Sequence, residues 1–258
     1  HLYANDLRAV HEEGISRIIL SANVTEATAM EAEFELRMQS VMFKVMFLAE
    51  QQIAVANVND LITTDCPVNF TTAIADAYNA QINAVTFDDS VLLNASAAQS
   101  LVYYESLIKQ INDIVMLATG YNTLVKDLKV ANAALDSLSV TLTAEQINTF
   151  KGYNNSVAAF VNYENAVANA TSQDDVNNAL AAIEEKFDVV AYGAQTYANA
   201  AIAVVAAKTA IAGLTNLLPA HVTSYNAFCD DTLPFDDYNR LSINADINKM
   251  MVPTRNST

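Results

Sequence analysis

The stretch from Val176 to Leu218 reads VNNALAAIEEKFDVVAYGAQTYANAAIAVVAAKTAIAGLTNLL, and it decides the fold class. Its apolar side chains recur at alternating spacings of four and three residues, which is the period of a coiled-coil helix. The series is Val176, Leu180, Ile183, Phe187, Val190, Ala194, Tyr197, Ala201, Val204, Lys208, Ile211, Thr215 and Leu218. We therefore expect one long helix with an apolar seam, which stops at Pro219 because proline cannot continue a helix.

The same rhythm recurs upstream and predicts further helices. The predicted ranges are 6–21, 25–61, 71–85, 91–138 and 143–169, the last of them opened by a capping box at Thr143 and Gln146. Five glycines and four prolines in 258 residues supply too few turns for a sandwich or a barrel. The chain is therefore expected to be all-α, an elongated bundle of long antiparallel helices with coiled-coil-like heptad seams. We expect residues 1–220 to form one bundle domain and 221–258 an irregular tail packed on it through Cys229.

Charge and hydropathy exclude several classes of partner. The net charge is −16, and no run of lysines or arginines could follow a phosphate backbone, so neither nucleic acid nor an anionic membrane surface is expected to bind. The longest apolar run in the final helix, Ala200 to Ala207, is far shorter than the ~20 residues of a membrane span. We therefore expect no transmembrane segment.

Two cysteines and six glycosylation sequons indicate an exported protein. Cys66 and Cys229 stand far apart, outside any metal-binding spacing, and we favour a disulfide between helix ends over two reduced thiols. The N-x-S/T sequons begin at Asn23, Asn69, Asn94, Asn154, Asn169 and Asn256. All but Asn154 fall at predicted helix ends or loops, where a glycan can be carried, so Asn154 is expected to be bare. The predicted location is extracellular, secreted or at the cell surface.

No motif for catalysis or for a cofactor is present. His1 could bind copper through its amine and imidazole, but that chemistry needs a second nearby histidine, and an ordinary cleaved N-terminus explains it better. The stripe Met38, Met42 and Met46 is interpreted as core packing rather than as a soft-metal site. Adjacent carboxylates such as Glu184 and Glu185 do not share a helical face, so they predict no acid/base pair. We therefore expect no enzyme, no bound metal and no cofactor.

The surface composition suggests self-association. An elongated bundle has more surface per residue than a sphere, yet only 16% of this chain is charged and 52% is hydrophobic. A stretch of small residues in the last long helix lets another backbone approach closely: Ala194, Ala198, Ala201, Ala206, Ala210 and Gly213. Lys208 occupies an apolar position there, where it either pairs with a carboxylate or extends to solvent.

Three functions fit these features, in decreasing order of preference. The first is a structural or interaction subunit of a coat, matrix or filament, formed by a secreted or surface glycoprotein that associates with itself. The second is an extracellular carrier whose bundle opens around a lipid or another apolar ligand. The third is a surface receptor that binds a host protein or another ligand.

Overall fold

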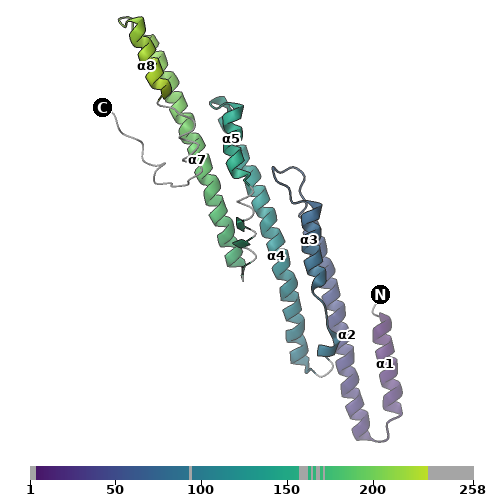
Figure 1. Ribbon diagram of the computed structural model, residues 1–258. Coiled ribbons are helices and arrows are strands. Elements are labelled where there is room, and N and C mark those ends of the chain that lie inside the picture. The colour runs from purple at the N-terminus through teal and green to yellow at the C-terminus, as the bar shows by residue number, and fades with distance from the viewer. Residues whose placement is uncertain are drawn as a thin grey trace. The chain divides into compact units, whose positions relative to one another are not determined.

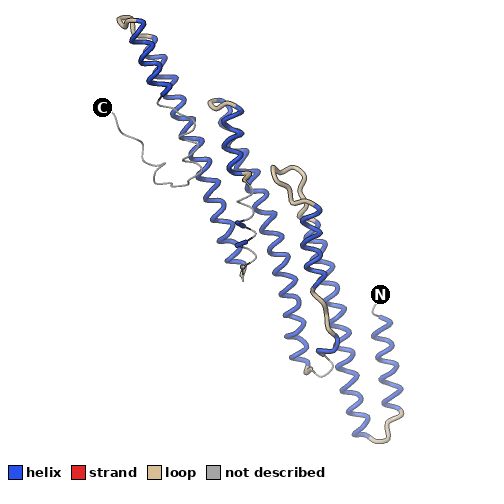
Figure 2. The backbone as a smooth tube through the Cα atoms, viewed as in Figure 1, coloured by secondary structure: helices blue, strands red, loops and turns tan. Residues whose placement is uncertain are grey.

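A computed structural model describes residues 4–92, 95–156, 162–163, 165–166, 169–170 and 172–231, and every element in these ranges is a helix (Figure 1). The elements are α1 (Ala4–Ile19), α2 (Val24–Asn59), α3 (Thr72–Ala84), η1 (Asp89–Val91), α4 (Ala97–Asp136), η2 (Ser137–Val140), α5 (Ala144–Asn154), α7 (Gln173–Ala212) and α8 (Pro219–Asp231). Figure 2 shows that the connections from α1 to α2 and from α7 to α8 are short turns. The all-α prediction is confirmed.

Side-chain caps fix where several helices begin. Asn23 accepts the backbone N–H of Glu26 at the start of α2, and Ser172 accepts that of Asp175 at the start of α7. Thr143 and Gln146 form the predicted capping box at the start of α5. Each cap satisfies a donor that the first helical turn leaves without a partner, and is worth about 1 kcal/mol. The helix predicted to reach residue 169 ends earlier, at Asn154.

The chain divides into two compact units, and the single bundle domain over residues 1–220 stays a prediction. Unit 1 contains residues 1–63 and 70–119, and unit 2 contains residues 64–69 and 120–258. The helix α4 contributes its first half to unit 1 and its second half to unit 2. Sequence periodicity could not reveal this division, because the boundary falls inside a continuous helix.

In unit 1, α1 and α2 pack against each other around the aromatic ring of Phe34. The two helices are antiparallel, with Glu13 bound to Arg37 by two hydrogen bonds of 3.1 and 3.2 Å. The ring of Phe34 is buried, and the guanidinium groups of Arg17 and Arg37 lie 5.2 and 5.0 Å from its centroid. Gly14 faces the same ring so closely that a Cβ there would lie 2.9 Å from it.

The second half of unit 1 joins α2 to α3 and to the start of α4. The Nε2 of Gln51 donates to the carbonyl oxygens of Ile82 and Val85, 2.8 and 3.0 Å away, and so satisfies two acceptors at the end of α3. The ring of Phe87 packs at a tilt against Phe47 and edge-on against Tyr103, with ring centroids 5.8 and 5.5 Å apart. These contacts hold the irregular segment after α3 against both long helices.

In unit 2 the long helices α4 and α7 are parallel rather than antiparallel. Gly120 lies against Val176 near the start of the contact, and Asp127 is hydrogen bonded to Glu184 two turns later. The two residues of each pair are 56 and 57 positions apart in the sequence. Because this separation stays nearly constant, the two helices run in the same direction. α5 packs against α7, where Gln146 near its start donates a hydrogen bond of 3.0 Å to the hydroxyl of Tyr197.

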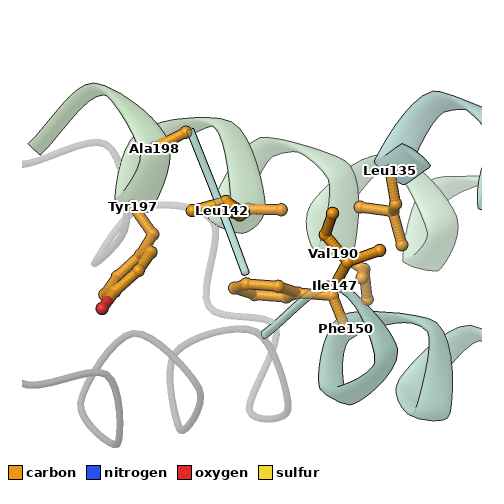
Figure 3. Close-up of a cluster of buried hydrophobic side chains, with 8 residues drawn as sticks. Leu135, Leu142, Ile147, Phe150, Val190, Tyr197 and Ala198 are labelled. Carbon is orange, nitrogen blue, oxygen red and sulfur yellow. The ribbon is translucent and has the colours of Figure 1, made fainter. Parts of the chain in front are cut away.

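The core of unit 2 lies where α4, α5 and α7 meet. Figure 3 shows side chains from these helices and from the turn before α5 gathered into one cluster. Its buried members are Leu135, Leu142, Ile147, Phe150, Val190, Ala194, Tyr197 and Ala198. From Val176 to Tyr197 every member of the predicted apolar series of α7 is buried except Leu180, which is half-buried. None of the later members is buried.

The last two described helices also differ from their prediction. α7 ends at Ala212 rather than continuing to Leu218, and Pro219 begins α8 instead of an irregular tail. Proline suits the first position of a helix, because the N–H that it lacks would have no partner there. Residues 232–258 of the predicted tail lie outside the described residues.

Candidate functional site

The predicted disulfide does not form: Cys66 and Cys229 are not bonded to each other. Asp65, next to Cys66, pairs with Lys129 on α4, while Asp230, next to Cys229, pairs with Lys208 on α7. In the parallel contact of the two helices, a residue of α4 lies beside the residue 57 positions later in α7, as Asp127 does beside Glu184. Position 129 of α4 therefore lies beside position 186 of α7. Position 208 lies 22 residues further on, about 33 Å along the helix. A disulfide needs Cα atoms within ~7 Å, and Cys229 lies in a helix rather than in the expected loop.

The sequons differ in how accessible their asparagines are. Asn23 is exposed, and its Oδ1 caps α2 while a glycan would attach to Nδ2, so the cap and a glycan are compatible. Asn169 is exposed, with its Nδ2 donating 2.7 Å to the carbonyl of Asn165. Asn69 is half-buried in a loop, where its Oδ1 accepts the N–H of Cys66 at 2.9 Å. Asn94 and Asn256 lie outside the described residues.

Asn154 is enclosed at the end of α5. It is 2% exposed, and its Nδ2 donates 3.1 Å to the Oδ1 of Asn132 on α4. The Nδ2 of Asn132 in turn donates 2.7 Å to the Oδ1 of Asn155. A glycan on Asn154 would break this amide chain and open the contact between α4 and α5. The fold therefore disfavours modification of this sequon.

In the described part of the chain, no three His, Cys, Asp or Glu side chains are placed to hold a metal ion. His1 lies outside the described residues. Met42 and Met46 are 54% and 45% exposed, so the stripe is not core packing as predicted. Their helix, α2, is covered by α1 and α3 along other faces.

The most distinctive surface in unit 2 is the hairpin of α7 and α8. No residue from Asn199 to Asp230 is buried, although 20 of these 32 residues are apolar, a higher share than the 52% of the whole chain. We use the term hairpin surface for its large exposed side chains, which are Ile202, Val205, Leu214, Leu218, Tyr225 and Phe228. Two helices alone cannot enclose a core, so this surface is left uncovered by the described residues.

The hairpin is nearly free of charge. Between Asn199 and Asp231 the charged side chains are Lys208, Asp230 and Asp231, in a chain whose net charge is −16. Lys208 occupies the apolar series of α7 and pairs with Asp230 on α8, which is the first of its two predicted outcomes. The predicted contact stretch is divided: Ala194 and Ala198 are buried in the core of unit 2, while Ala206 and Ala210 are exposed on the hairpin.

A groove between α4 and α7 contains carboxyl groups that the sequence did not reveal. It has a volume of about 310 Å³ and is lined by Asp127, Val130, Ala131, Ala134, Glu184, Phe187, Asp188 and Ala191. Burial raises the pKa of Asp127, and the charge and hydrogen bond of Glu184 raise that pKa further. Adjacent acids on one helix share no face, but this pair forms between two helices, so only the register of α4 on α7 could have predicted it.

Among the described residues, the two helices α2 and α7 are long and apolar enough to cross a membrane when judged by length and composition alone. In α7 a third of the most apolar window is buried within the protein, and core helices commonly meet the same criteria.

Comparison with known proteins places the chain in no family: no family model, no curated protein and no solved structure matches it.

Proposed function

We propose that this chain is a non-enzymatic extracellular glycoprotein that acts as a structural or interaction subunit, and that its copies associate through the hairpin surface. One observation carries the proposal: a predominantly apolar hairpin in which no residue from Asn199 to Asp230 is buried. Exposed apolar patches of this kind mark interfaces in water-soluble proteins.

The low charge of the hairpin favours a second copy as its partner. Two molecules with a net charge of −16 repel each other over most of their surface. The hairpin has three charged residues, and two of them neutralise each other in the Lys208–Asp230 pair. Contact between two hairpins therefore adds little repulsion to the apolar area that it buries. The exposed small side chains Ala206 and Ala210 allow close approach of helices.

The test compares the same substitution at two exposed valines of unit 2. Val205 on the hairpin is 64% exposed, and Val140 in η2, outside it, is 95% exposed. We expect Val205→Glu to weaken self-association about tenfold in sedimentation equilibrium, which corresponds to ~1.4 kcal/mol. Val140→Glu should associate like the wild type, and far-UV circular dichroism should show the same helicity in all three proteins.

Other occupants of the surface give different results. If residues 232–258 cover the hairpin, the wild type stays monomeric, and only a chain truncated after Asp231 associates. If the chain is a carrier of lipid, solvent extraction of the purified monomer releases lipid. Either result, or equal association of both valine variants, contradicts the proposal.

A further inference from the structure

The groove between α4 and α7 brings two carboxyl groups together, those of Asp127 and Glu184. Asp127 extends from α4 and is hydrogen bonded to Glu184 of α7. Ionised carboxylates only accept hydrogen bonds, so this contact requires a proton on one of the two groups. The Oδ2 atom of Asp127 is shielded from solvent, and no group in the described chain donates to it. A shielded carboxylate oxygen without a donor disfavours the ionised form, so this environment favours a proton on Asp127.

The charges around the pair reinforce this requirement. Asp188, one turn after Glu184 on α7, lines the same groove and adds a third carboxylate. On α4, the neighbouring Lys126 is exposed, and Lys129 is engaged with the aspartate at position 65. No ion pair in the described residues includes Asp127, Glu184 or Asp188. The remaining lining residues are aliphatic or aromatic and contribute no charge.

We propose that the Asp127–Glu184 pair is an acid-sensitive latch, which joins α4 to α7 through one shared proton and weakens this contact when both carboxyl groups are ionised. This inference is independent of the association of hairpins, because the groove lies in the part of α7 that precedes the hairpin. The latch makes unit 2 more stable in mildly acidic solution than at neutral pH.

The direction of the pH dependence follows from the pKa of Asp127. Burial and Glu184 raise this pKa above the ordinary value of 3.8, which the unfolded chain retains. Between the two values the folded state binds more protons than the unfolded state, so stability increases as the pH falls. The gain is complete below the ordinary pKa and is lost as the pH rises through the raised value.

Urea unfolding of the full chain at pH 7 and pH 5 tests the latch. In the Asp127→Asn variant an amide takes the place of the protonated carboxyl group and donates to Glu184 at every pH. We expect this variant to unfold at higher urea concentration than the wild type at pH 7, and to lose the wild type's gain between pH 7 and pH 5. The control is Glu185→Gln, which removes an exposed carboxylate next to the pair and should retain the wild-type gain.

A second measurement does not depend on the stability of a variant. In a chain labelled with ¹³C at the aspartate carboxyl carbons, the resonance missing from Asp127→Asn identifies this residue. We expect that resonance to titrate at higher pH than those of exposed aspartates. An ordinary titration of Asp127, or an equal gain in stability for the wild type and Asp127→Asn, would overturn the proposal.

Discussion

Replacing Gly120 with alanine should destabilise unit 2, although helix propensity predicts the opposite. Gly120 lies inside α4, where alanine is favoured over glycine by about 1 kcal/mol. A Cβ at this position would lie 1.9 Å from the hydroxyl of Tyr163 and 2.9 Å from a methyl group of Val176. Glycine is therefore required here because another segment and the start of α7 approach the α4 backbone.

The cost follows from how little room Tyr163 has. Its hydroxyl must retreat by about 1.5 Å to reach an ordinary contact of 3.4 Å. The side chain is 1% exposed and meets Tyr121 edge-on at 6.3 Å, so the movement displaces other packed atoms. Overpacking of this kind costs about 1–3 kcal/mol. After the gain in propensity we expect a net loss of up to about 2 kcal/mol, equivalent to a few degrees in Tm.

The matched control is Gly152→Ala in the same unit. Gly152 lies in α5 and is exposed, and a Cβ there would meet nothing within 4 Å. Only propensity acts at this position, so we expect a gain of up to about 1 kcal/mol. Urea unfolding followed by circular dichroism measures both variants. If Gly120→Ala stabilises the protein as much as Gly152→Ala does, the close approach at Gly120 is refuted.

Three further predictions concern unit 1 and the sequons. Gly14→Ala should destabilise unit 1 by about 1–2 kcal/mol, because its Cβ would lie 2.9 Å from the buried ring of Phe34, and urea unfolding tests this. Hydrogen bonds from Arg37 and the charges of Arg37 and Arg17 lower the pKa of Glu13, so the stability that Glu13 contributes is present above pH 4.5 and is lost as the pH falls through the lowered pKa. Glu13→Gln should therefore reduce the loss of amide protection of α1 in acid, as measured by hydrogen exchange. Peptide mass mapping of the native protein should find a glycan on Asn23 and none on Asn154, and a modified Asn154 would contradict its burial.

The helices were predictable because their signals are local. Apolar spacing and the Thr143 capping box depend on residues within a few turns, and the capping box appears in the structure where the sequence placed it. The end of α7 was misplaced, because its apolar rhythm continues to Leu218 while the helix stops at Ala212. Periodicity shows which side chains can share a face, but it does not show that the backbone remains helical.

Features that depend on tertiary register could not be predicted. The parallel contact of α4 with α7 places Asp127 beside Glu184, residues that are 57 positions apart in the chain. The same register separates the surroundings of Cys66 from those of Cys229, which is why the expected disulfide was wrong. The division into two units was equally hidden, since it interrupts no helix.

The central claim is that the uncovered hairpin brings copies of this chain together. Light scattering coupled to size exclusion, applied to the full chain over a wide range of concentrations, tests it most directly. The polypeptide has a mass of 27.9 kDa. We expect a mass that is a multiple of this value, after correction for any glycan, and that decreases on dilution as the copies separate. A monomeric mass at every concentration would contradict the claim.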